Sequence, residues 1–341
     1  MKTKFWNRMM IAVGLLAVSA FAAAMVEYHL TNTYKFGAAP GGREYFDYIF
    51  FDGEGRRLYL SHGTEVVVVN ADTGKEEGKI SGLKQSHGIA VVHDVGKGFV
   101  SDGAQGKAVI FDLKTLKVEG AAEAAPDADC IIYDPATKRV FTFNGDSKSA
   151  SVIDPATGKN VGTVDLGGGP EFAVADGKGM IYNNLEDESQ VLAIDARELK
   201  VKSRWPIAPA GKPAPIAMDR EHRRLFVAGR DPAMLVVMNA DDGKVIQSFP
   251  ISNGADADVY DAKSGLIFVS TREGWVHIFH EDSPDHYSEA GKVKTEFGAK
   301  TMAYDPEKDH IFVDTAEFGK AMEGSRPRAV PGTLHLLEYG Q

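Results

Sequence analysis

Short apolar runs alternate with turn-forming residues along most of the chain. Within residues 86–118, the segments 89–92, 98–101 and 108–111 are such runs, and Gly, Asp and Lys stand between them. Runs this short, rich in β-branched and aromatic residues and bounded by turn formers, predict β-strands rather than helices. The chain is therefore expected to form a succession of short strands.

The same unit of strands occurs seven times. Aligned on the residue that opens the first strand of each unit, the copies follow one another at intervals of 40 to 44 residues. The aligned positions are Asp47, His87, Asp129, Glu171, Ala214, Asp256 and Lys300. One copy is too small to bury both faces of its sheet, so neighbouring copies must pack against each other. A repeat of this length with four short strands predicts an all-β fold, a seven-bladed β-propeller.

The two ends of the repeat region predict how the ring closes. Residues 28–36 alternate like a strand but precede the first copy, and residues 332–339 form a third strand that no fourth strand follows. We expect the N-terminal strand to supply the outer strand of the last blade. Such closure leaves no unpaired blade edge, which would otherwise invite aggregation.

Three recurring segments resemble the repeat of a known propeller family. They are His-Gly-Ile-Ala-Val at 87–91, an aromatic-Val-Ser second strand at 99–101, and Val-Ile-Asp-Pro-Ala-Thr-Gly-Lys at 152–159. The combination resembles the YVTN β-propeller repeat of YncE-like secreted proteins, over nearly all of residues 28–340. The resemblance implies a binding or surface protein without a shared catalytic motif. It also offers single-stranded DNA binding, described for some YncE-like proteins, as an alternative.

The first 24 residues have the layout of a secretory signal peptide. Lys2, Lys4 and Arg8 precede an apolar run over 9–21, and three alanines follow at 22–24. The run is shorter than the roughly 20 apolar residues that a spanning helix needs, so we expect cleavage after Ala24 rather than an uncleaved anchor. The expected product is periplasmic or extracellular, with one propeller domain over 25–341 and no transmembrane segment.

Composition narrows the possible chemistry. The formal net charge is −10, and loss of the three cations in residues 1–24 would bring it to −13. An acidic surface opposes binding to phosphate backbones, so nucleic acid is the less favoured partner. The single cysteine, Cys130, excludes an intramolecular disulfide and stands in an apolar strand, which predicts a small buried hydrophobe. Gly-rich phosphate loops, Gly-x-Ser-x-Gly and paired-cysteine motifs are absent, which removes common nucleotide, hydrolase and zinc sites.

The candidate site lies at the end of the ring where the first strands begin. Turns at the opposite end repeat from copy to copy, whereas the connections at this end vary, and variable loops on a repeated scaffold are where a site is expected. The residues expected at this channel mouth are Asp47, His87, Asp129, Glu171, Asp256 and Lys300, with Arg230 and Arg272 just outside. The carboxylates and histidines lie mainly in the first four copies, and the cations Arg230, Arg272 and Lys300 lie in the last three, which suits a small polar ligand with an anionic end. A protein partner is the other class of ligand, and solvated strand ends around a water-filled channel are the structural alternative.

A second hypothesis places a divalent metal ion at the same mouth. Asp47, His62, His87 and Asp102 come from the first two copies and offer imidazole and carboxylate ligands. No local spacing such as His-x-x-x-His enforces this site. With the metal, the protein would be a lactonase- or lyase-type enzyme, in which the ion polarises an oxygen and a histidine moves protons. The interpretation that we favour is a monomeric binding or interaction protein without a cofactor.

The seventh copy carries a long insert at 316–331, where other copies connect the same strands in a few residues. A connection of this length either covers the channel mouth or is mobile. Its candidate ligand contacts are Phe318, Arg326 and Arg328.

Overall fold

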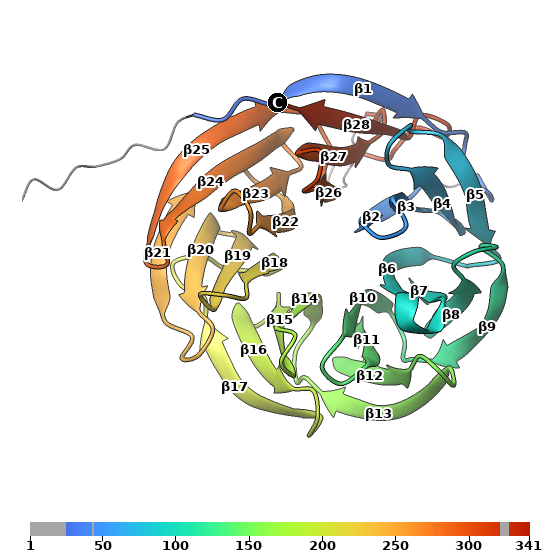
Figure 1. Cartoon of the computed structure of the whole chain (residues 1–341), viewed down its shortest axis with the longest axis horizontal. Coiled ribbons are helices and arrows are strands. Elements are labelled where there is room, and N and C mark those ends of the chain that lie inside the picture. Colours follow the sequence, from blue (N-terminus) through green and yellow to red (C-terminus); the bar gives the residue numbers. More distant parts are fainter. Residues whose placement is uncertain (1–24, 43, 321–326) are drawn as a thin grey trace, which may run out of the picture.

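The computed structural model describes residues 25–42, 44–320 and 327–341. In these residues the chain forms seven four-stranded antiparallel sheets, which stand as blades around a central axis (Figure 1). The seven-bladed, all-β propeller predicted from the repeat is confirmed. The expected signal peptide at 1–24 and the candidate contact Arg326 lie outside the described residues. Within the described part of the chain, no helix is both long enough and apolar enough to cross a membrane.

Blades 1 to 6 take their four strands in chain order from the axis outward. Blade 1 has β2 (Phe46–Asp52), β3 (Arg57–His62), β4 (Glu65–Asn70) and β5 (Glu76–Ser81). Blade 2 has β6 (Ser86–Val92), the 3-10 helix η1 (His93–Val95), β7 (Lys97–Asp102), β8 (Lys107–Asp112) and β9 (Val118–Glu123). Blade 3 has β10 (Ala128–Asp134), β11 (Arg139–Asn144), β12 (Ser149–Asp154) and β13 (Lys159–Asp165).

The next three blades repeat the pattern. Blade 4 has β14 (Pro170–Ala175), β15 (Met180–Leu185), β16 (Gln190–Asp195) and β17 (Lys200–Pro206). Blade 5 has β18 (Pro213–Asp219), β19 (Arg224–Arg230), β20 (Ala233–Asn239) and β21 (Val245–Pro250). Blade 6 has β22 (Ala255–Asp261), β23 (Leu266–Thr271), β24 (Trp275–Ser283) and β25 (His286–Lys294).

Blade 7 is completed by the beginning of the chain. Its strands β26 (Met302–Asp305), β27 (His310–Thr315) and β28 (His335–Gly340) are joined by β1 (His29–Lys35), which runs antiparallel to β28. Side chains reinforce the pairing, because Asn32 and Tyr34 each donate a hydrogen bond of 2.7 Å to Glu338 Oε2. The predicted closure of the ring is confirmed (Figure 1).

The hydrophobic core lies between the blades. Side chains on a strand alternate between the two faces of its sheet, and in a propeller both faces meet a neighbouring blade. Between blades 1 and 2, for example, Tyr59 and Val66 pack with Ile89, Val100 and Phe111. Strands buried on both faces read as continuous apolar runs, which explains sequences such as 66–69 in β4 and 108–111 in β8.

At the face opposite the channel mouth, side chains of the turns accept hydrogen bonds from the backbone of the same turn. Asp134 accepts the N–H groups of Ala136 at 3.3 Å and Thr137 at 3.0 Å. Between third and fourth strands, Gly74 and Gly158 adopt left-handed φ values of 68° and 67°, which favour glycine. The repeated Asp and Gly residues therefore form turns, as their uniformity from copy to copy predicts.

Two aromatic rings meet across the axis. Tyr48 of blade 1 lies against Phe172 of blade 4, with ring centroids 4.8 Å apart and planes inclined by 31°. Blades 1 and 4 are not neighbours, so the two rings touch across the channel rather than between adjacent sheets. Tyr48 also packs against the apolar cluster that contains Cys130. Cys130 is 3% exposed, so it is buried as its sequence context predicts. Asp47 and Glu171, two of the polar residues that open first strands, directly precede these two rings in the chain.

Candidate functional site

A β-bulge near the start of the first strands brings their second residue to the axis. In β2, β6 and β10 the pairing with the next strand shifts between the first and the fourth residue, and Asp47, His87 and Asp129 lie within these shifts. A repeated serine satisfies the backbone that the bulge frees. Ser61 Oγ, for example, accepts the N–H groups of Asp47 at 3.0 Å and Tyr48 at 2.8 Å.

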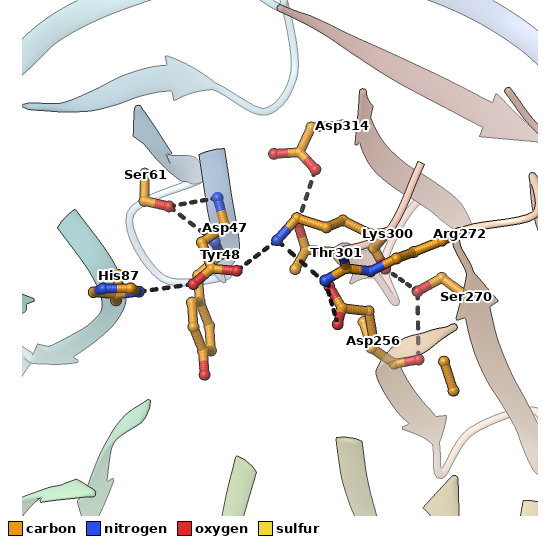
Figure 2. A network of polar contacts seen from close by, with 12 residues as sticks. Asp47, Tyr48, Ser61, His87, Asp256, Ser270, Arg272, Lys300, Thr301 and Asp314 are labelled. Atoms are coloured by element: carbon orange, nitrogen blue, oxygen red, sulfur yellow. Dashed lines mark hydrogen bonds and ion pairs between the residues drawn. The ribbon is translucent and has the colours of Figure 1, made fainter. Parts of the chain in front are cut away.

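One half of the channel mouth is a chain of ion pairs centred on Asp47 (Figure 2). Asp47 Oδ1 lies 2.6 Å from Lys300 Nζ, and Asp47 Oδ2 lies 2.8 Å from His87 Nδ1. His87 Nδ1 lies 3.1 Å from Asp129 Oδ1 as well. Tyr45 donates its hydroxyl to Asp47 Oδ2 at 3.0 Å. Four of the residues predicted at the mouth therefore form a continuous chain of contacts, in the order Lys300, Asp47, His87 and Asp129.

The charges on this half fix its protonation state. Burial alone would raise the pKa of Asp47, but the positive charges of Lys300 and His87 outweigh it and lower the pKa. Burial alone would lower the pKa of His87, but its contacts with Asp129 and Asp47 raise the pKa to about 10. His87 is therefore an imidazolium at neutral pH, held between two carboxyl groups.

The other half of the mouth is centred on Asp256, whose side chain is 4% exposed. Arg230 Nη2 lies 2.5 Å and Arg272 Nη2 lies 3.2 Å from Asp256 Oδ1, and Lys300 Nζ lies 3.5 Å from Asp256 Oδ2. Burial alone would raise the pKa of Asp256, but these three cations lower it. Arg230 continues the chain to Glu171, at 3.5 Å. Burial raises the pKa of Glu171 well above its usual range in spite of that contact.

All eight residues expected to bind ligand at the mouth thus belong to one network of charges. Lys300 is the link between its two halves, because it approaches both Asp47 and Asp256 (Figure 2). Of the seven aligned positions only Ala214 is apolar, and Arg230 from the same blade occupies that part of the mouth.

The structure separates the four residues expected to hold a metal. His62 is 1% exposed and bonds through Nε2 to Glu44, and Asp102 is fully buried, where it accepts the N–H groups of Lys84 at 2.8 Å and Gln85 at 3.1 Å. Both side chains make these bonds inside the blades, although His62 Nδ1 has no partner among the described residues, and neither joins the ligand atoms that converge around Asp47 and His87. The group whose ligand atoms lie within 4.8 Å of one another is Asp47, His87 and Asp129.

Asp314 is a mouth residue that sequence reasoning missed. It lies near Lys300 in Figure 2, and its Oδ1 accepts a hydrogen bond of 2.8 Å from Thr301 Oγ1. Burial raises the pKa of Asp314 to about 7, although Lys300 acts in the opposite direction. Blades 1, 2 and 6 carry a serine at the equivalent position of the second strand. A carboxylate in place of a repeated serine was the signal that could have identified it.

Beside the polar mouth lies a cavity of about 1050 Å³. Phe46, Phe297 and Phe318 form an apolar wall, in which the ring centroids of Phe318 lie 5.6 Å from Phe297 and 6.5 Å from Phe46. The cations that line the cavity are Arg272, Lys300 and Arg328. Two of the three contacts expected from the blade 7 insert, Phe318 and Arg328, therefore lie at this cavity.

The described ends of the blade 7 insert are fixed to the ring. Phe318 and Ala329 pair with each other as an isolated β-bridge. Gly332 donates its N–H to Glu44 Oε2 at 2.9 Å, and Glu44 is the carboxylate that binds His62. His62, expected at a metal site, instead helps to fasten the insert beside the mouth.

Comparisons with known proteins identify the fold but no family. No protein-family model and no curated protein matches the chain. Among solved structures it is similar to hydrazine synthase of Kuenenia stuttgartiensis, with a TM-score of 0.69 and 15% identity over 82% of this chain and 93% of that chain. It is similar to a chain of the mitotic checkpoint complex, with a TM-score of 0.72 and 12% identity over 100% and 99%. It is also similar to U3-55K, with a TM-score of 0.73 and 8% identity over 89% and 98%.

At these identities the similarity shows the β-propeller fold alone. This fold typically serves as a scaffold for binding and interaction, and the function of any one member depends on the site that its loops carry.

Proposed function

We propose that the protein is a binding protein that takes a small carboxylate with an apolar body at the channel mouth. The observation that carries the proposal is the cavity of about 1050 Å³, which combines an aromatic wall with Arg272, Lys300 and Arg328. Small-molecule sites are concave, mostly apolar and provided with a few polar groups that orient the ligand. A cavity of this composition suits an organic acid better than a sugar or a free inorganic ion.

Arg272 has unused capacity for an anion. Its side chain is 34% exposed, and of its nitrogens only Nη2 donates to a carboxylate among the described residues. That carboxylate, Asp256, is shared with Arg230 and Lys300. A guanidinium presents several parallel N–H donors that match a carboxylate, so Arg272 is the group that we expect to orient the ligand.

The surrounding carboxylates limit the charge of the ligand. Glu44 and Asp47 also line the cavity, and Asp47 is ionised because the pKa of its carboxyl is lowered. Like charges within a few ångströms repel, so a doubly charged phosphate is disfavoured relative to a single carboxylate. The expected class is therefore monocarboxylates with an aromatic or branched aliphatic body.

Paired probes test this proposal. Isothermal titration with 3-phenylpropionate and with its neutral amide compares two ligands of the same size that differ in charge. We expect the acid to bind at least about tenfold more tightly, because a buried charged hydrogen bond contributes on the order of 1.5–3 kcal/mol. Equal affinity for acid and amide, or no binding of any monocarboxylate in a wider series, would overturn the proposal.

Two arginine variants localise the binding. Arg328→Gln removes an exposed cation of the cavity and should weaken binding of the acid, but not of the amide. Arg197→Gln is the matched control, because Arg197 is also exposed and lies in the turn after β16, at the opposite face. If both variants bind the acid like the unchanged protein, the site lies elsewhere.

We further propose membership of the YVTN propellers and export to the periplasm or the extracellular space. The segments at 87–91 and 152–159 support the family, and the order of charged, apolar and small residues in 1–24 supports export. Cell fractionation with and without residues 1–24 tests the location, and we expect the shortened chain to stay in the cytoplasm.

A metal-dependent lactonase- or lyase-type activity is the second candidate. The observation in its favour is the grouping of Asp47, His87 and Asp129, whose ligand atoms lie within 4.8 Å. An ion there would have to displace the proton on His87 Nδ1, which lies 2.8 Å from Asp47 Oδ2 and 3.1 Å from Asp129 Oδ1. Metal analysis of the purified protein separates the two functions, since stoichiometric metal that is lost in His87→Ala favours the enzyme.

Single-stranded DNA binding remains the alternative offered by the YVTN resemblance. The formal net charge of −10 opposes it, because phosphate neutralisation calls for a basic surface. Gel shifts over a range of salt concentrations decide, and a steep loss of binding with salt would favour DNA.

A further inference from the structure

A second polar cluster lies at the face opposite the mouth, between blades 5 and 6. Asp219 is the last residue of β18, His222 lies in the turn to β19, and Glu281 lies near the end of β24. The first strands begin at the mouth, so the end of β18 lies at the other face of the ring. The ligand atoms of these three residues lie within 4.8 Å of one another.

Two buried carboxylates face one imidazole in this cluster. His222 Nδ1 lies 2.8 Å from Asp219 Oδ2 and 3.0 Å from Glu281 Oε1. The side chains of Asp219 and Glu281 are only 2% and 4% exposed, whereas that of His222 is 41% exposed. Glu281 Oε1 is covered from solvent and accepts no hydrogen bond of normal geometry within the described ranges. A buried, unsatisfied carboxylate oxygen is costly and calls for a cation.

An elongated outer hairpin in blade 6 brings Glu281 to this position. β24 and β25 each span nine residues, whereas the corresponding strands of blade 5, β20 and β21, span seven and six. The added length carries Glu281 beyond the end of the blade, where it pairs with Tyr287. The third ligand therefore comes from a feature that distinguishes blade 6 from its neighbour.

Contacts around the cluster hold its ligand atoms in place. The N–H of Glu221 donates to Asp219 Oδ1 at 2.9 Å, and Tyr260 donates its hydroxyl to Glu281 Oε2 at 2.8 Å. The other two oxygens, Asp219 Oδ2 and Glu281 Oε1, face His222, whose backbone N–H also donates to Asp219 Oδ2 at 3.0 Å. Hydrogen bonds to the remote oxygen of a ligating carboxylate are the usual outer support of a metal site.

Arg224 fixes the two loops that carry the cluster without neutralising it. Its guanidinium donates to the carbonyl of His222 and to the carbonyl of Pro284, both at 2.7 Å. Its ion pair is with the exposed Asp285. Arg224 thus connects the β18–β19 turn to the β24–β25 hairpin through hydrogen bonds. It forms no ion pair with Asp219 or Glu281 among the described contacts, so His222 is the basic side chain that contacts both carboxylates.

We propose that Asp219, His222 and Glu281 bind a divalent transition-metal ion of the Zn²⁺ class and so link blades 5 and 6. One imidazole and two carboxylates suit Zn²⁺, whereas Ca²⁺ and Mg²⁺ take six or more ligands, mostly oxygens. The ion binds His222 Nδ1 and neutralises both carboxylates. This site is separate from the channel mouth and does not depend on the function proposed there.

Zinc titration of the EDTA-treated full chain tests the proposal. We expect one Zn²⁺ ion to bind and to raise the Tm, because a ligand that binds only the folded state stabilises it. His222→Ala removes an exposed side chain and should fold normally, but it should bind Zn²⁺ at least about tenfold more weakly. Glu281→Gln keeps the size of the side chain, removes its charge and should weaken binding to a similar extent.

His93→Ala is the matched control. His93 lies at the same face, and its Nε2 is 2.8 Å from Asp52 Oδ1, but it belongs to none of the groups whose ligand atoms converge in the described chain. This variant should bind Zn²⁺ like the unchanged protein. The proposal is overturned if the unchanged protein takes up no Zn²⁺, or if His222→Ala retains full affinity, including the case in which His87→Ala removes the ion instead.

Discussion

Lys300 Nζ lies 2.6 Å from Asp47 Oδ1 and so joins the last blade to the first at the channel mouth. The same ammonium lies 3.5 Å from Asp256, so Lys300→Met leaves two largely buried carboxylates without it. Removal of one partner from a buried ion pair is strongly destabilising. Because Asp47 keeps 18% exposure, we expect a loss of about 2–4 kcal/mol in the free energy of unfolding, somewhat below the fully buried case. Urea unfolding at neutral pH measures it.

Lys148→Met is the matched control for that substitution. Lys148 Nζ lies 2.8 Å from Asp187 Oδ2, but the two side chains are 51% and 42% exposed. An exposed ion pair contributes at most about 1 kcal/mol, so this variant should unfold almost like the unchanged protein. Equal losses in the two variants would show that the mouth network does not stabilise the ring.

Deletion of residues 28–36 should destabilise the whole ring. It removes β1, which has six paired positions along β28, and Tyr28, which packs on Phe268 with ring centroids 5.8 Å apart. At about 1 kcal/mol per hydrogen bond, the loss is on the order of 5 kcal/mol, which corresponds to a fall in Tm of roughly 10 °C or more. A thermal melt without any loss would refute the role of β1.

A chain that starts at Tyr28 separates this effect from simple shortening. It loses the hydrogen bond from Val26 to Ala290 but keeps all of β1. Its Tm should stay close to that of the longer protein.

The sequence determined the architecture and the positions around the mouth because both follow from one period. Once the copies were aligned, Asp47 and Lys300 had to meet at the axis, although 253 residues separate them. In the same way, the end of the second strand predicts that Arg230 and Arg272 lie at the channel mouth. Because neighbouring strands are antiparallel, the position of a residue within the repeat determines at which end of the ring it lies, and this prediction needs no further information.

The period could not predict contacts that differ between copies. His62 and Asp102 stand one position before the equivalents of Arg230 and Arg272, and they turn into their blades, where His62 bonds to Glu44 and Asp102 accepts from the backbone at 84–85. Equally, nothing in the repeat shows that Tyr48 crosses the channel to Phe172 or that the blade 7 insert leaves a cavity. Such features depend on side-chain size and on loops outside the repeat.

Asp314 should make stability depend on pH. Its pKa is raised from 3.8 to about 7 in the folded protein, so the folded state binds more protons than the unfolded state between these values. Stability from this group is complete below pH 3.8 and is lost as the pH rises to about 7. Asp314→Asn keeps an acceptor for Thr301 but cannot ionise. Its free energy of unfolding relative to the unchanged protein should rise by up to about 1.4 kcal/mol per pH unit in this window. Parallel pH profiles for the two proteins would contradict the assignment.

Asp258 stands where the other blades carry an apolar residue. It pairs with Val269 in β23, as Ile49 pairs with Leu60 in β3. The equivalent residues of the remaining blades are Ile89, Ile131, Ala173, Ile216 and Met302. Both carboxylate oxygens of Asp258 are covered from solvent and accept no hydrogen bond from any described residue. Burial raises the pKa of this carboxyl well above its usual range.

Asp258→Val should therefore stabilise the protein. An unsatisfied buried polar group costs about 1–3 kcal/mol, and valine restores the apolar contact that the other blades make. Because the folded state disfavours the ionised carboxyl, the cost of Asp258 grows as the pH rises above its ordinary pKa, and the gain from valine should be larger at pH 8 than at pH 5. Asp314→Val serves as the contrast, because there Thr301 Oγ1 loses its acceptor and the variant should be destabilised at pH 5. Urea unfolding at both pH values measures the two effects. If Asp258→Val is less stable than the unchanged protein at both pH values, the carboxyl of Asp258 makes a contact in solution that outweighs the cost of its burial. Asp258 would then belong to the polar channel rather than to the apolar core.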